Sequence, residues 1–585
     1  MIGLVAVTAA GRTAAERLGA ALQASFLYPG PPQRAIARGF AECDQIVCFL
    51  AVGATVRLIA PLLRSKAADP GVVCVDEALR FAVPVAGSHA GGANQLAQRI
   101  ADILGATAVI TTGSDARGVP ALDEFGAELG WVVAPGSDLA KVGAAVLSGD
   151  RVTLSMDQTW PVPALPANVV RTAAPEPGVP AIVVTDRLLS AAPGGSPPSP
   201  PSVALRGSPP AVIYRPPSLV LGAGASRGVS SVEVGDLMDA ALADAKLSPD
   251  SVCGVATVDV KKDEYGLVQA ARERGLAVTS FPPQDLAAVA VPNPSDAVRA
   301  ATGTPSVAEA AALLAAGDGA ALAAAKRKSA RATVAIARRR PRGRLALVGL
   351  GPGARDLMTP RAVAELRRAS VVVGLSQYLD QVRDLLLPGA RVLASHLGAE
   401  EERARTAAEQ ALAGDAVALV GSGDAGVYAM ASPVLELIDR SVDVTGVPGV
   451  TAALAAAAAL GAPLGHDHAS ISLSDLHTPW EVIERRINAA ADADFVVSFY
   501  NPRSPARGGH LAKALAILAP RRPPATPVGM VADASRPGER VRLSTLADFD
   551  PGEADMRSLV IVGSSKTHLA AGRMVTPRGY RWETR

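Results

Sequence analysis

Residues 343–353 read GRLALVGLGPG, a short apolar run that ends in three closely spaced glycines. The apolar run at 345–348 predicts a buried strand, and the segment 358–360 after the loop leads into a helical stretch, so this is a strand, a loop and a helix. Glycines let the backbone pass close to a ligand. The spacing G-x-G-x-G differs from the G-x-G-x-x-G of dinucleotide-binding folds, and no acidic residue follows at the next strand end. A plain dinucleotide site is therefore not predicted.

Three later segments repeat this pattern of an apolar run followed by a loop of small residues. They are 416–420 before GSGDAGVY (421–428), 442–445 before GVPGVTAA (446–453), and 495–499 before YNPRS (500–504). Ligands of open α/β sheets bind beyond the carboxyl ends of the strands. The four strand ends therefore predict one cleft at the carboxyl edge of a sheet.

The whole chain has the composition of a multidomain α/β protein. Its 585 residues are 49% apolar, 19% charged and only 3% aromatic, which excludes a disordered chain and predicts cores built from Ala, Val and Leu. Short apolar runs alternate with Ala-rich helical stretches, which favours largely parallel sheets. These runs include 46–50, 72–75, 108–111 and 182–185.

Two composition breaks divide the chain. Residues 190–217 are rich in Pro, Gly and Ser, a composition that predicts an extended linker, and the basic run at 338–343 marks a second boundary. The predicted parts are 1–135, a middle region at 136–189, the linker at 190–217, then 218–338 and 343–585.

The charge balance and the ends of the chain limit the partners. Lys plus Arg total 57 and Asp plus Glu total 55, so we expect no nucleic-acid or membrane partner. The N-terminus reads as a strand rather than a signal peptide, and the uncharged stretch at 445–465 reads as a buried helix. Four irregularly spaced cysteines predict reduced thiols in a cytoplasmic protein and no metal site.

From residue 343 onward the chain resembles the tetrapyrrole methylase family, and within it the precorrin-3B C(17)-methyltransferases. The segments that carry the resemblance are VGLGPG, GSGDAGVYA, GVPGVTAA, GHDHASISLSDLHTPW, FYNPRS and VADASRPGE. The resemblance implies a two-subdomain α/β methylase of cobalamin synthesis, usually a homodimer, that uses S-adenosylmethionine on a precorrin substrate. It places the methyl donor against Gly351, Pro352, Gly353, Gly423, Asp424, Ala425, Thr451 and Ala452.

The chemistry that this resemblance implies asks for alignment more than for strong acids or bases. A sulfonium methyl is already activated, so the enzyme mainly aligns the reacting carbon and excludes water. The family reaction also contracts the macrocycle, which a base would assist. The candidate bases are Asp475, His466 and Asp467; the alternative is that Asp475 caps the next helix and that His466 is a structural residue.

Asn501 and Arg503 are the expected substrate contacts in the fourth loop. A guanidinium binds carboxylates bidentately, so Arg503 fits a carboxylate of the substrate. An exposed structural arginine is the alternative reading.

The first half resembles the cobalt-precorrin-5A hydrolase family over about 1–131 and 219–337. A glycine pair with His, Asn and Asp near strand ends predicts a pocket. Water attack on a lactone would use His89 or Asp115 as a base, with Lys261 or Arg227 for the oxyanion. A cysteine usual in the family's GxGCxRG loop is Ala225 here, so a non-catalytic binding domain is the alternative.

The leading hypothesis is thus a fused enzyme of corrin synthesis. The alternatives are a tetrapyrrole methylase of other regiochemistry, such as C(11) or C(20), and a non-catalytic tetrapyrrole carrier. Stoichiometric binding of S-adenosylmethionine separates an enzyme from a carrier.

Overall fold

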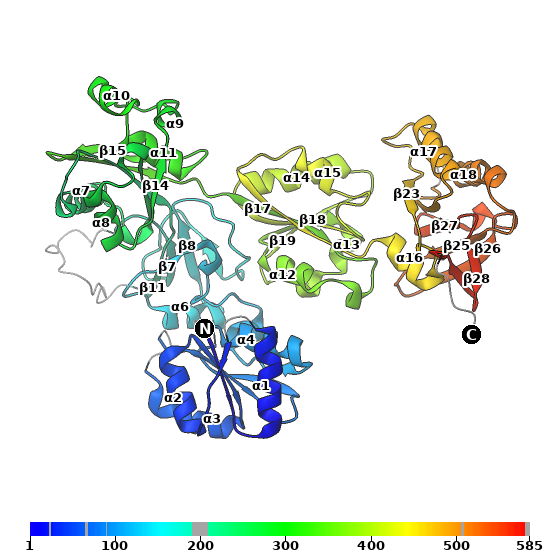
Figure 1. The fold of residues 1–585 in the computed structure, drawn as a ribbon, viewed down its shortest axis with the longest axis horizontal. Helices are drawn as coiled ribbons and strands as arrows, with labels where there is room; N and C mark the ends of the chain where they lie inside the picture. The colour runs from blue at the N-terminus through cyan, green and yellow to red at the C-terminus, as the bar shows by residue number, and fades with distance from the viewer. Residues whose placement is uncertain (23–24, 65–67, 89–90, 190–208, 505–507, 580–585) are drawn as a thin grey trace. The chain divides into compact units, whose positions relative to one another are not determined.

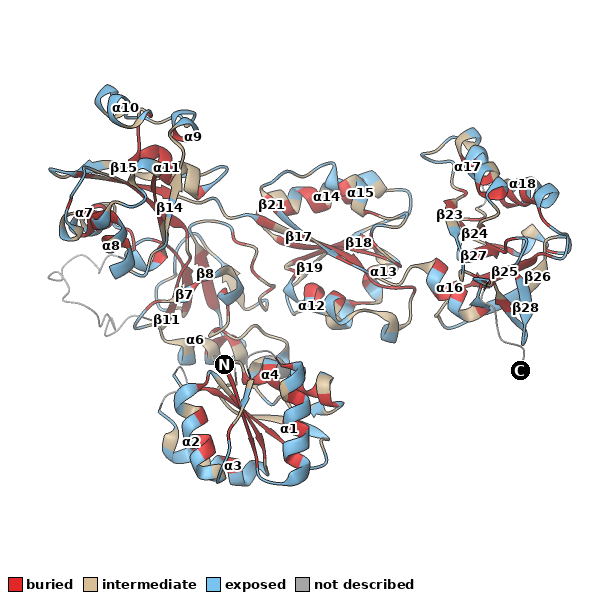
Figure 2. Ribbon diagram, in the orientation of Figure 1, coloured by how far each residue is buried: buried red, intermediate tan, exposed pale blue. Residues whose placement is uncertain are grey.

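The computed structural model describes residues 1–22, 25–64, 68–88, 91–189, 209–504 and 508–579 (Figure 1). The chain divides into two compact units, which are residues 1–159 with 165–341, and residues 160–164 with 342–585. Buried residues concentrate on the strands and on the helix faces that cover them (Figure 2). The multidomain α/β fold predicted from the sequence is confirmed.

The first sheet of unit 1 is covered by helices on both faces. Its strands pair in the order β2 (Ser25–Leu27), β1 (Ile2–Ala6), β3 (Gln45–Phe49), β4 (Gly71–Val75), β5 (Phe81–Ala86) and β6 (Thr107–Ala108). All pairs are parallel except β4 with β5. α1 (Ala9–Ala21) and α4 (Ala93–Leu104) pack on one face, and α2 (Pro32–Glu42) and α3 (Val52–Ile59) on the other.

The second sheet differs from the prediction at the end of the proposed linker. Its order is β7 (Val132–Val133), β11 (Ala211–Arg215), β10 (Ala181–Val184), β8 (Val152–Met156) and β9 (Val169–Arg171), with α5 (Gly113–Arg117) and α6 (Leu139–Ser148) in the same part of the chain. β11 lies inside the range predicted as linker and pairs in parallel with β10. An average over a proline-rich window hides a short Ala-Val-Ile-Tyr strand at its end. Residues 190–208 lie outside the described chain.

The third sheet mixes parallel and antiparallel pairs. Its order is β14 (Val278–Phe281), β13 (Val252–Val258), β12 (Leu219–Ala225), β16 (Ala332–Arg338) and β15 (Ala321–Lys328), and β16 is antiparallel to both neighbours. One face holds α7 (Ser231–Asp244) and α8 (Tyr265–Glu273). The other face is covered by α9 (Pro283–Ala287), α10 (Asp296–Thr302) and α11 (Ala308–Ala316).

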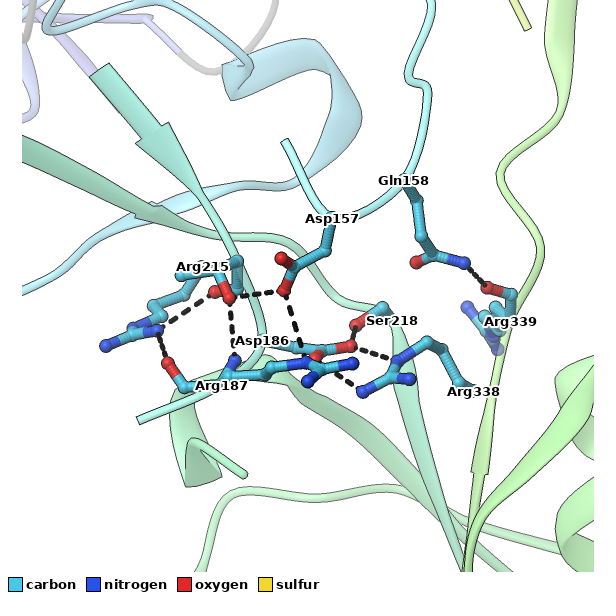
Figure 3. Close-up of polar contacts among 9 residues, drawn as sticks. Asp157, Gln158, Asp186, Arg187, Arg215, Ser218, Arg338 and Arg339 are labelled. Carbon is cyan, nitrogen blue, oxygen red and sulfur yellow. Dashed lines mark hydrogen bonds and ion pairs between the residues drawn. The ribbon is translucent and has the colours of Figure 1, made fainter. Parts of the chain in front are cut away.

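A buried ion pair ties the end of β10 to the end of β16 (Figure 3). Asp186 is 2% exposed and accepts two hydrogen bonds from Arg338, at 2.6 Å from Nε and 2.8 Å from Nη2. The Ser218 hydroxyl donates a third bond to Asp186, at 2.7 Å. A buried charge is tolerated when it is paired and hydrogen-bonded in this way. The second and third sheets are therefore joined by a satisfied polar contact.

Further polar contacts surround this pair (Figure 3). Arg215 Nη1 donates to the carbonyls of Thr185 and Arg187 at 3.0 and 2.6 Å, and burial lowers the pKa of this guanidinium. Gln158 Nε2 donates to the Arg339 carbonyl at 2.9 Å.

Unit 2 contains a fully parallel sheet, and its first strand along the chain is the one that runs into the first glycine loop. The order is β19 (Arg391–Ser395), β18 (Val371–Leu375), β20 (Ala416–Gly421), β17 (Gly343–Gly349) and β21 (Val442–Val447). α12 (Pro360–Arg368) and α13 (Ser376–Asp380) cover one face, and α14 (Glu400–Leu412) and α15 (Ala431–Leu435) cover the other. Parallel strands buried on both faces explain the continuous apolar runs.

The second main sheet of unit 2 is mostly antiparallel, contrary to the prediction of largely parallel sheets. Its order is β23 (His468–Ser472), β24 (Val496–Tyr500), β27 (Ser558–Val562), β25 (Pro527–Ala532) and β26 (Arg540–Thr545). α16 (Ala452–Leu460) packs on one face, and α17 (Trp480–Asp492) and α18 (His510–Leu518) on the other. β22 (Gly461–Ala462), β29 (Arg573–Val575) and β28 (His568–Ala570) form a small separate sheet.

The uncharged stretch at 445–465 contains α16, whose Ala-rich face is buried as predicted. Among the described residues, none of the helices combines the length and apolarity that crossing a bilayer requires. The four cysteines are free thiols, and three of them are buried: Cys43, Cys48 and Cys74.

Candidate functional site

Three glycine loops meet at the carboxyl ends of β17, β20 and β21. An added Cβ on Gly449 would lie 2.0 Å from the Gly423 carbonyl oxygen, and one on Gly349 would lie 2.7 Å from the same atom. Contacts that short exclude any side chain, so glycine is required for the three loops to touch.

The first two loops are also joined by backbone hydrogen bonds. Gly351 N donates to the Gly423 carbonyl at 3.1 Å, and Gly423 N donates to the Gly351 carbonyl at 2.7 Å. Both residues have positive φ, +77° and +67°. The pair therefore forms a two-bond bridge that holds one loop against the other.

Asp424 braces the second loop against the third. Its Oδ1 accepts from Gly426 N at 2.8 Å and its Oδ2 accepts from Gly449 N at 3.0 Å. Both carboxylate oxygens thus bind the protein's own backbone. The geometry indicates that Asp424 shapes the loops.

The third loop receives a side chain from the other sheet. The Tyr500 hydroxyl lies 2.7 Å from Thr451 Oγ1 and accepts from Ala453 N at 3.1 Å, at the start of α16 beside Ala452. The predicted single sheet edge is therefore wrong for the fourth loop, because β24 belongs to the second sheet. Its end nevertheless reaches the third loop through Tyr500, a residue that the sequence analysis did not select.

Arg536 is a second residue that the sequence analysis missed. It lies between β25 and β26, in the VADASRPGE segment. Its Nε donates to the Pro352 carbonyl at 2.8 Å and its Nη2 donates to Ser422 Oγ at 3.1 Å. It therefore contacts the first and second loops together.

Tyr428, after Ala425 in the second loop, makes a third contact between the two sheets of unit 2. Its hydroxyl donates to the Ser470 carbonyl at 2.7 Å, and its ring centroid lies 5.0 Å from that of Tyr500. Tyr428 has a φ of +50°, a conformation that non-glycine residues rarely adopt. Burial raises the pKa of its phenol.

The predicted substrate contacts lie just beyond β24. Asn501 Nδ2 donates to Ser472 Oγ at 3.1 Å, at the adjoining end of β23. Arg503 donates from Nη1 to the Gly552 carbonyl, which fixes the direction of its guanidinium.

Asp475 lies three residues beyond the end of β23 and pairs with a histidine. Its Oδ2 is 3.6 Å from Nε2 of His510, whose Nδ1 is 3.1 Å from the Leu473 carbonyl. His510 also stacks on Trp480 with centroids 4.7 Å apart. α17 begins after Pro479 without a side-chain cap, so the alternative reading of Asp475 as a cap is wrong.

His466 and Asp467 lie at the opposite end of β23 from Asp475. Asp467 N donates to His466 Nδ1 at 2.7 Å, and the Asp467 carbonyl accepts from Val496 N at the start of β24. Five residue steps separate Asp467 from the carboxyl end of β23 at Ser472, roughly 16 Å. The structure therefore groups only Asp475 with the fourth loop.

A separate hollow of about 620 Å³ lies in unit 1. Its lining is mostly apolar and includes the polar side chains of Ser88, Thr112, Ser114 and Asp123. The predicted base His89 lies outside the described residues, and Asp115 is placed in α5 without a described side chain.

Lys261 and Arg227 do not line this hollow. Lys261 follows β13 and lies 3.8 Å from Glu264, whose Oε1 accepts from Gly228 N in the loop that carries Arg227. Neither predicted oxyanion residue is therefore part of the hollow.

Comparison with known proteins assigns the second unit. A family model described as Tetrapyrrole (Corrin/Porphyrin) Methylases matches residues 344–550. A protein of Salmonella typhimurium named as a cobalt-factor III C(17)-methyltransferase is 49% identical over 239 residues, which is 40% of this chain and 99% of that protein. This chain belongs to the tetrapyrrole methylase family.

Two other known proteins are similar to the tetrapyrrole methylase region. The precorrin-3B C(17)-methyltransferase of Sinorhizobium sp is 42% identical and covers 41% of this chain and 97% of its own length. The crystal structure of the methyltransferase CobJ is 38% identical, with a TM-score of 0.39, over 40% of this chain and all of that one. Several other relatives are longer, and the chain spans about half of their length.

The part of the chain before the tetrapyrrole methylase region matches three further family models. They are described as Cobalamin synthesis G N-terminal, at 34–115, Cobalamin biosynthesis central region, at 120–216, and Cobalamin synthesis G C-terminus, at 219–337. The chain is thus a fusion of these domains with a methyltransferase.

Proposed function

We propose that the second unit transfers the methyl group of S-adenosylmethionine to carbon 17 of precorrin-3B, or of its cobalt-containing counterpart, with contraction of the macrocycle. The names of the two relatives covered over nearly their whole length support this substrate. The observation that carries the proposal is the meeting of three glycine loops at one sheet edge, where the resemblance places the methyl donor.

The described loops fit such a donor. Gly421 is buried at the end of β20, yet an added Cβ there would meet no atom within 4 Å. Backbone that borders open space inside a domain leaves room for a ligand edge. The predicted contacts Gly351, Pro352 and Gly353 lie in the loop bonded to Gly423, which keeps these backbones at one edge.

The chain's own residues align the reactants. S-adenosylmethionine supplies an activated methyl group, so little acid or base chemistry is asked of the loops at that step. Asp424 and the Gly351 bridge fix the loops before binding, which limits the entropy lost when the donor binds. Thr451 and Ala452 present the start of α16 to the same place.

Asp475 is the proposed proton acceptor for the contraction step, with His510 as its partner. The Asp475 carboxylate and the His510 imidazole lie 3.6 Å apart, an ion-pair distance, just beyond the ends of β23 and β24. Asn501 and Arg503, in the adjoining loop, are proposed to hold carboxylates of the substrate.

The decisive experiment follows the product by mass spectrometry after the full chain meets S-adenosylmethionine and precorrin-3B or its cobalt form. We expect one added methyl group and ring contraction, weakened by Asp424→Ala. Asp475→Asn is expected to slow the contraction more than the methyl transfer. Tight tetrapyrrole binding without turnover, and without binding of S-adenosylmethionine, would favour a non-catalytic carrier. A methyl on another carbon would indicate another regiochemistry.

A homodimer is also proposed from the resemblance, and a cytoplasmic location from the four irregularly spaced cysteines. Light scattering of the purified chain measures the first, and a mass of one chain would contradict it.

A second candidate function is lactone opening by unit 1. The hollow of about 620 Å³ supports it, because its size suits a small-molecule site and Ser88, Thr112, Ser114 and Asp123 give it polar groups. The cobalt-precorrin-5A hydrolase family opens a ring lactone and releases acetaldehyde, so release of acetaldehyde from cobalt-precorrin-5A tests this function. His89→Ala and Asp115→Asn are expected to abolish the release. Binding without release in the unchanged protein would leave unit 1 a binding domain.

A further inference from the structure

We propose that Arg536 is a positioning residue of the methyl-donor site. Its side chain, from the turn between β25 and β26 in the second main sheet of unit 2, sets the geometry of the first and second glycine loops. This inference rests on the proposed function, because it takes those loops to hold the donor. The structure shows Arg536 bonded to both loops at once, to the Pro352 carbonyl and to Ser422 Oγ.

The stem of Arg536 also determines what can occupy the first loop. An added Cβ on Gly353 would lie 2.4 Å from Arg536 Cγ and 2.6 Å from its Nε. Gly353 further has a φ of +148°, which disfavours a side chain. A side chain at position 353 would therefore clash with Arg536 where it now lies.

The turn that carries Arg536 is held in an unusual conformation. Asp533 and Ser535 both have positive φ, at +51° and +62°, which costs free energy for non-glycine residues. The turn is held by Arg536 N donating to the Asp533 carbonyl at 2.9 Å, and by Ser535 N donating to Glu539 at 2.6 Å. Strain that the surroundings maintain in this way clusters at functional sites.

The partners of Arg536 are distant in the sequence: Pro352 is 184 positions away and Ser422 is 114 positions away. Both loops contain predicted donor contacts, Pro352 in the first and Gly423 beside Ser422 in the second. Loss of the guanidinium would leave the first loop held by the Gly351–Gly423 bridge, and the donor would then have to order the Pro352 end of that loop itself. Donor affinity is therefore expected to depend on a residue that the donor need not touch.

The test measures binding of S-adenosylhomocysteine to the full chain by calorimetry, a readout that needs no tetrapyrrole. Arg536→Met keeps the stem over Gly353 and removes both hydrogen bonds, so we expect about tenfold weaker binding. Arg536→Lys keeps the positive charge but cannot make the two hydrogen bonds with the same geometry. Its affinity should therefore lie between those of the unchanged protein and Arg536→Met. The control is Arg540→Met in the same hairpin, an exposed residue 3.8 Å from Asp555, which should bind within twofold of the unchanged protein.

The outcomes separate the two claims. If the unchanged chain fails to bind S-adenosylhomocysteine, the proposed function fails. If it binds and Arg536→Met binds within twofold of it, the positioning role is overturned. A merely structural role would lower the melting temperature and leave the affinity of the folded protein unchanged, so both are measured. Should Arg536→Met fail to fold, Arg536→Lys decides by the same criteria.

Gly353→Ala gives an independent check. It forces Arg536 out of its position, so combining it with Arg536→Met should weaken binding by less than the product of the single effects. If the loss of binding in the double variant equals the product of the two single losses, the two residues act independently and the inferred clash between them is contradicted.

Discussion

Replacing Asp186 by alanine should destabilise the junction of the second and third sheets far more than a surface ion pair would. The carboxylate is 2% exposed and accepts bonds at 2.6, 2.8 and 2.7 Å from Arg338 and Ser218. Removing one partner of a buried pair leaves the other charge uncompensated, which costs about 3–5 kcal/mol.

A double variant distinguishes the cost of the uncompensated Arg338 charge from the cost of the lost contacts. In the double variant with Arg338→Met, the uncompensated guanidinium is gone, so we expect the double variant to be more stable than Asp186→Ala alone. The control is Glu176→Ala, which breaks the Arg151 ion pair at 2.7 Å. That pair has side-chain exposures of 53% and 38%, so its loss should cost far less stability than the loss of Asp186.

Hydrogen exchange read by mass spectrometry suits this test, because a chain of two units does not have one unfolding free energy. Amides of β10 and β16 should exchange faster in Asp186→Ala by roughly two to three and a half powers of ten. An acceleration below tenfold, or a double variant less stable than Asp186→Ala, would refute the reasoning.

Three further predictions concern single groups. Asp424→Ala should weaken binding of S-adenosylmethionine about tenfold, because Gly449 N and Gly426 N lose a charged acceptor, and calorimetry measures it. Tyr500→Phe should destabilise the start of α16 by about 1–2 kcal/mol, seen as faster hydrogen exchange there, since Ala453 N loses its acceptor. Burial raises the pKa of Cys74 to about 11, so the free energy of opening the first sheet, where Cys74 lies in β4, should fall as pH rises from the ordinary thiol value, about 8.5, toward 11.

Each of these predictions has a matched control. Asp443→Ala removes an exposed carboxylate of the same sheet and should leave donor binding unchanged; equal weakening would contradict the bracing role of Asp424. Tyr265→Phe alters a tyrosine that is 76% exposed and should leave exchange unaltered, whereas equal effects would remove the case for Tyr500. Cys74→Ala should lessen the alkaline loss of stability, because the folded thiol stays neutral while the unfolded one ionises. An unchanged pH slope would count against this linkage.

The strands and their glycine loops could be predicted because their signal is local. A continuous apolar run that ends in small residues is read within ten residues, and 345–348 and 416–420 became β17 and β20. The strand β11 was missed because proline-rich neighbours dominate the average over its window. The single sheet edge predicted for all four loops is wrong for β24, because a strand's own sequence does not determine its pairing partner.

The roles of side chains within the site were less predictable. Tyr500 and Arg536 lie in segments that the sequence marked, yet their partners are 49 and 184 residues away. The role of Asp424 depends on Gly449 N, in a loop after a different strand. Such contacts follow from how the loops pack, which one sequence does not record.

The place of β16 in its sheet has a consequence for synthesis on the ribosome. β16 is hydrogen-bonded to both β12 and β15, so it lies inside the sheet. It is also the last strand of this sheet along the chain, and it ends at Arg338, five residues before β17 begins. The nascent chain therefore completes the third sheet only after all of its other strands have emerged, and β12 remains an open edge until then. During that interval the emerging domain exposes an unpaired strand, which is the state most open to aggregation or to capture by chaperones.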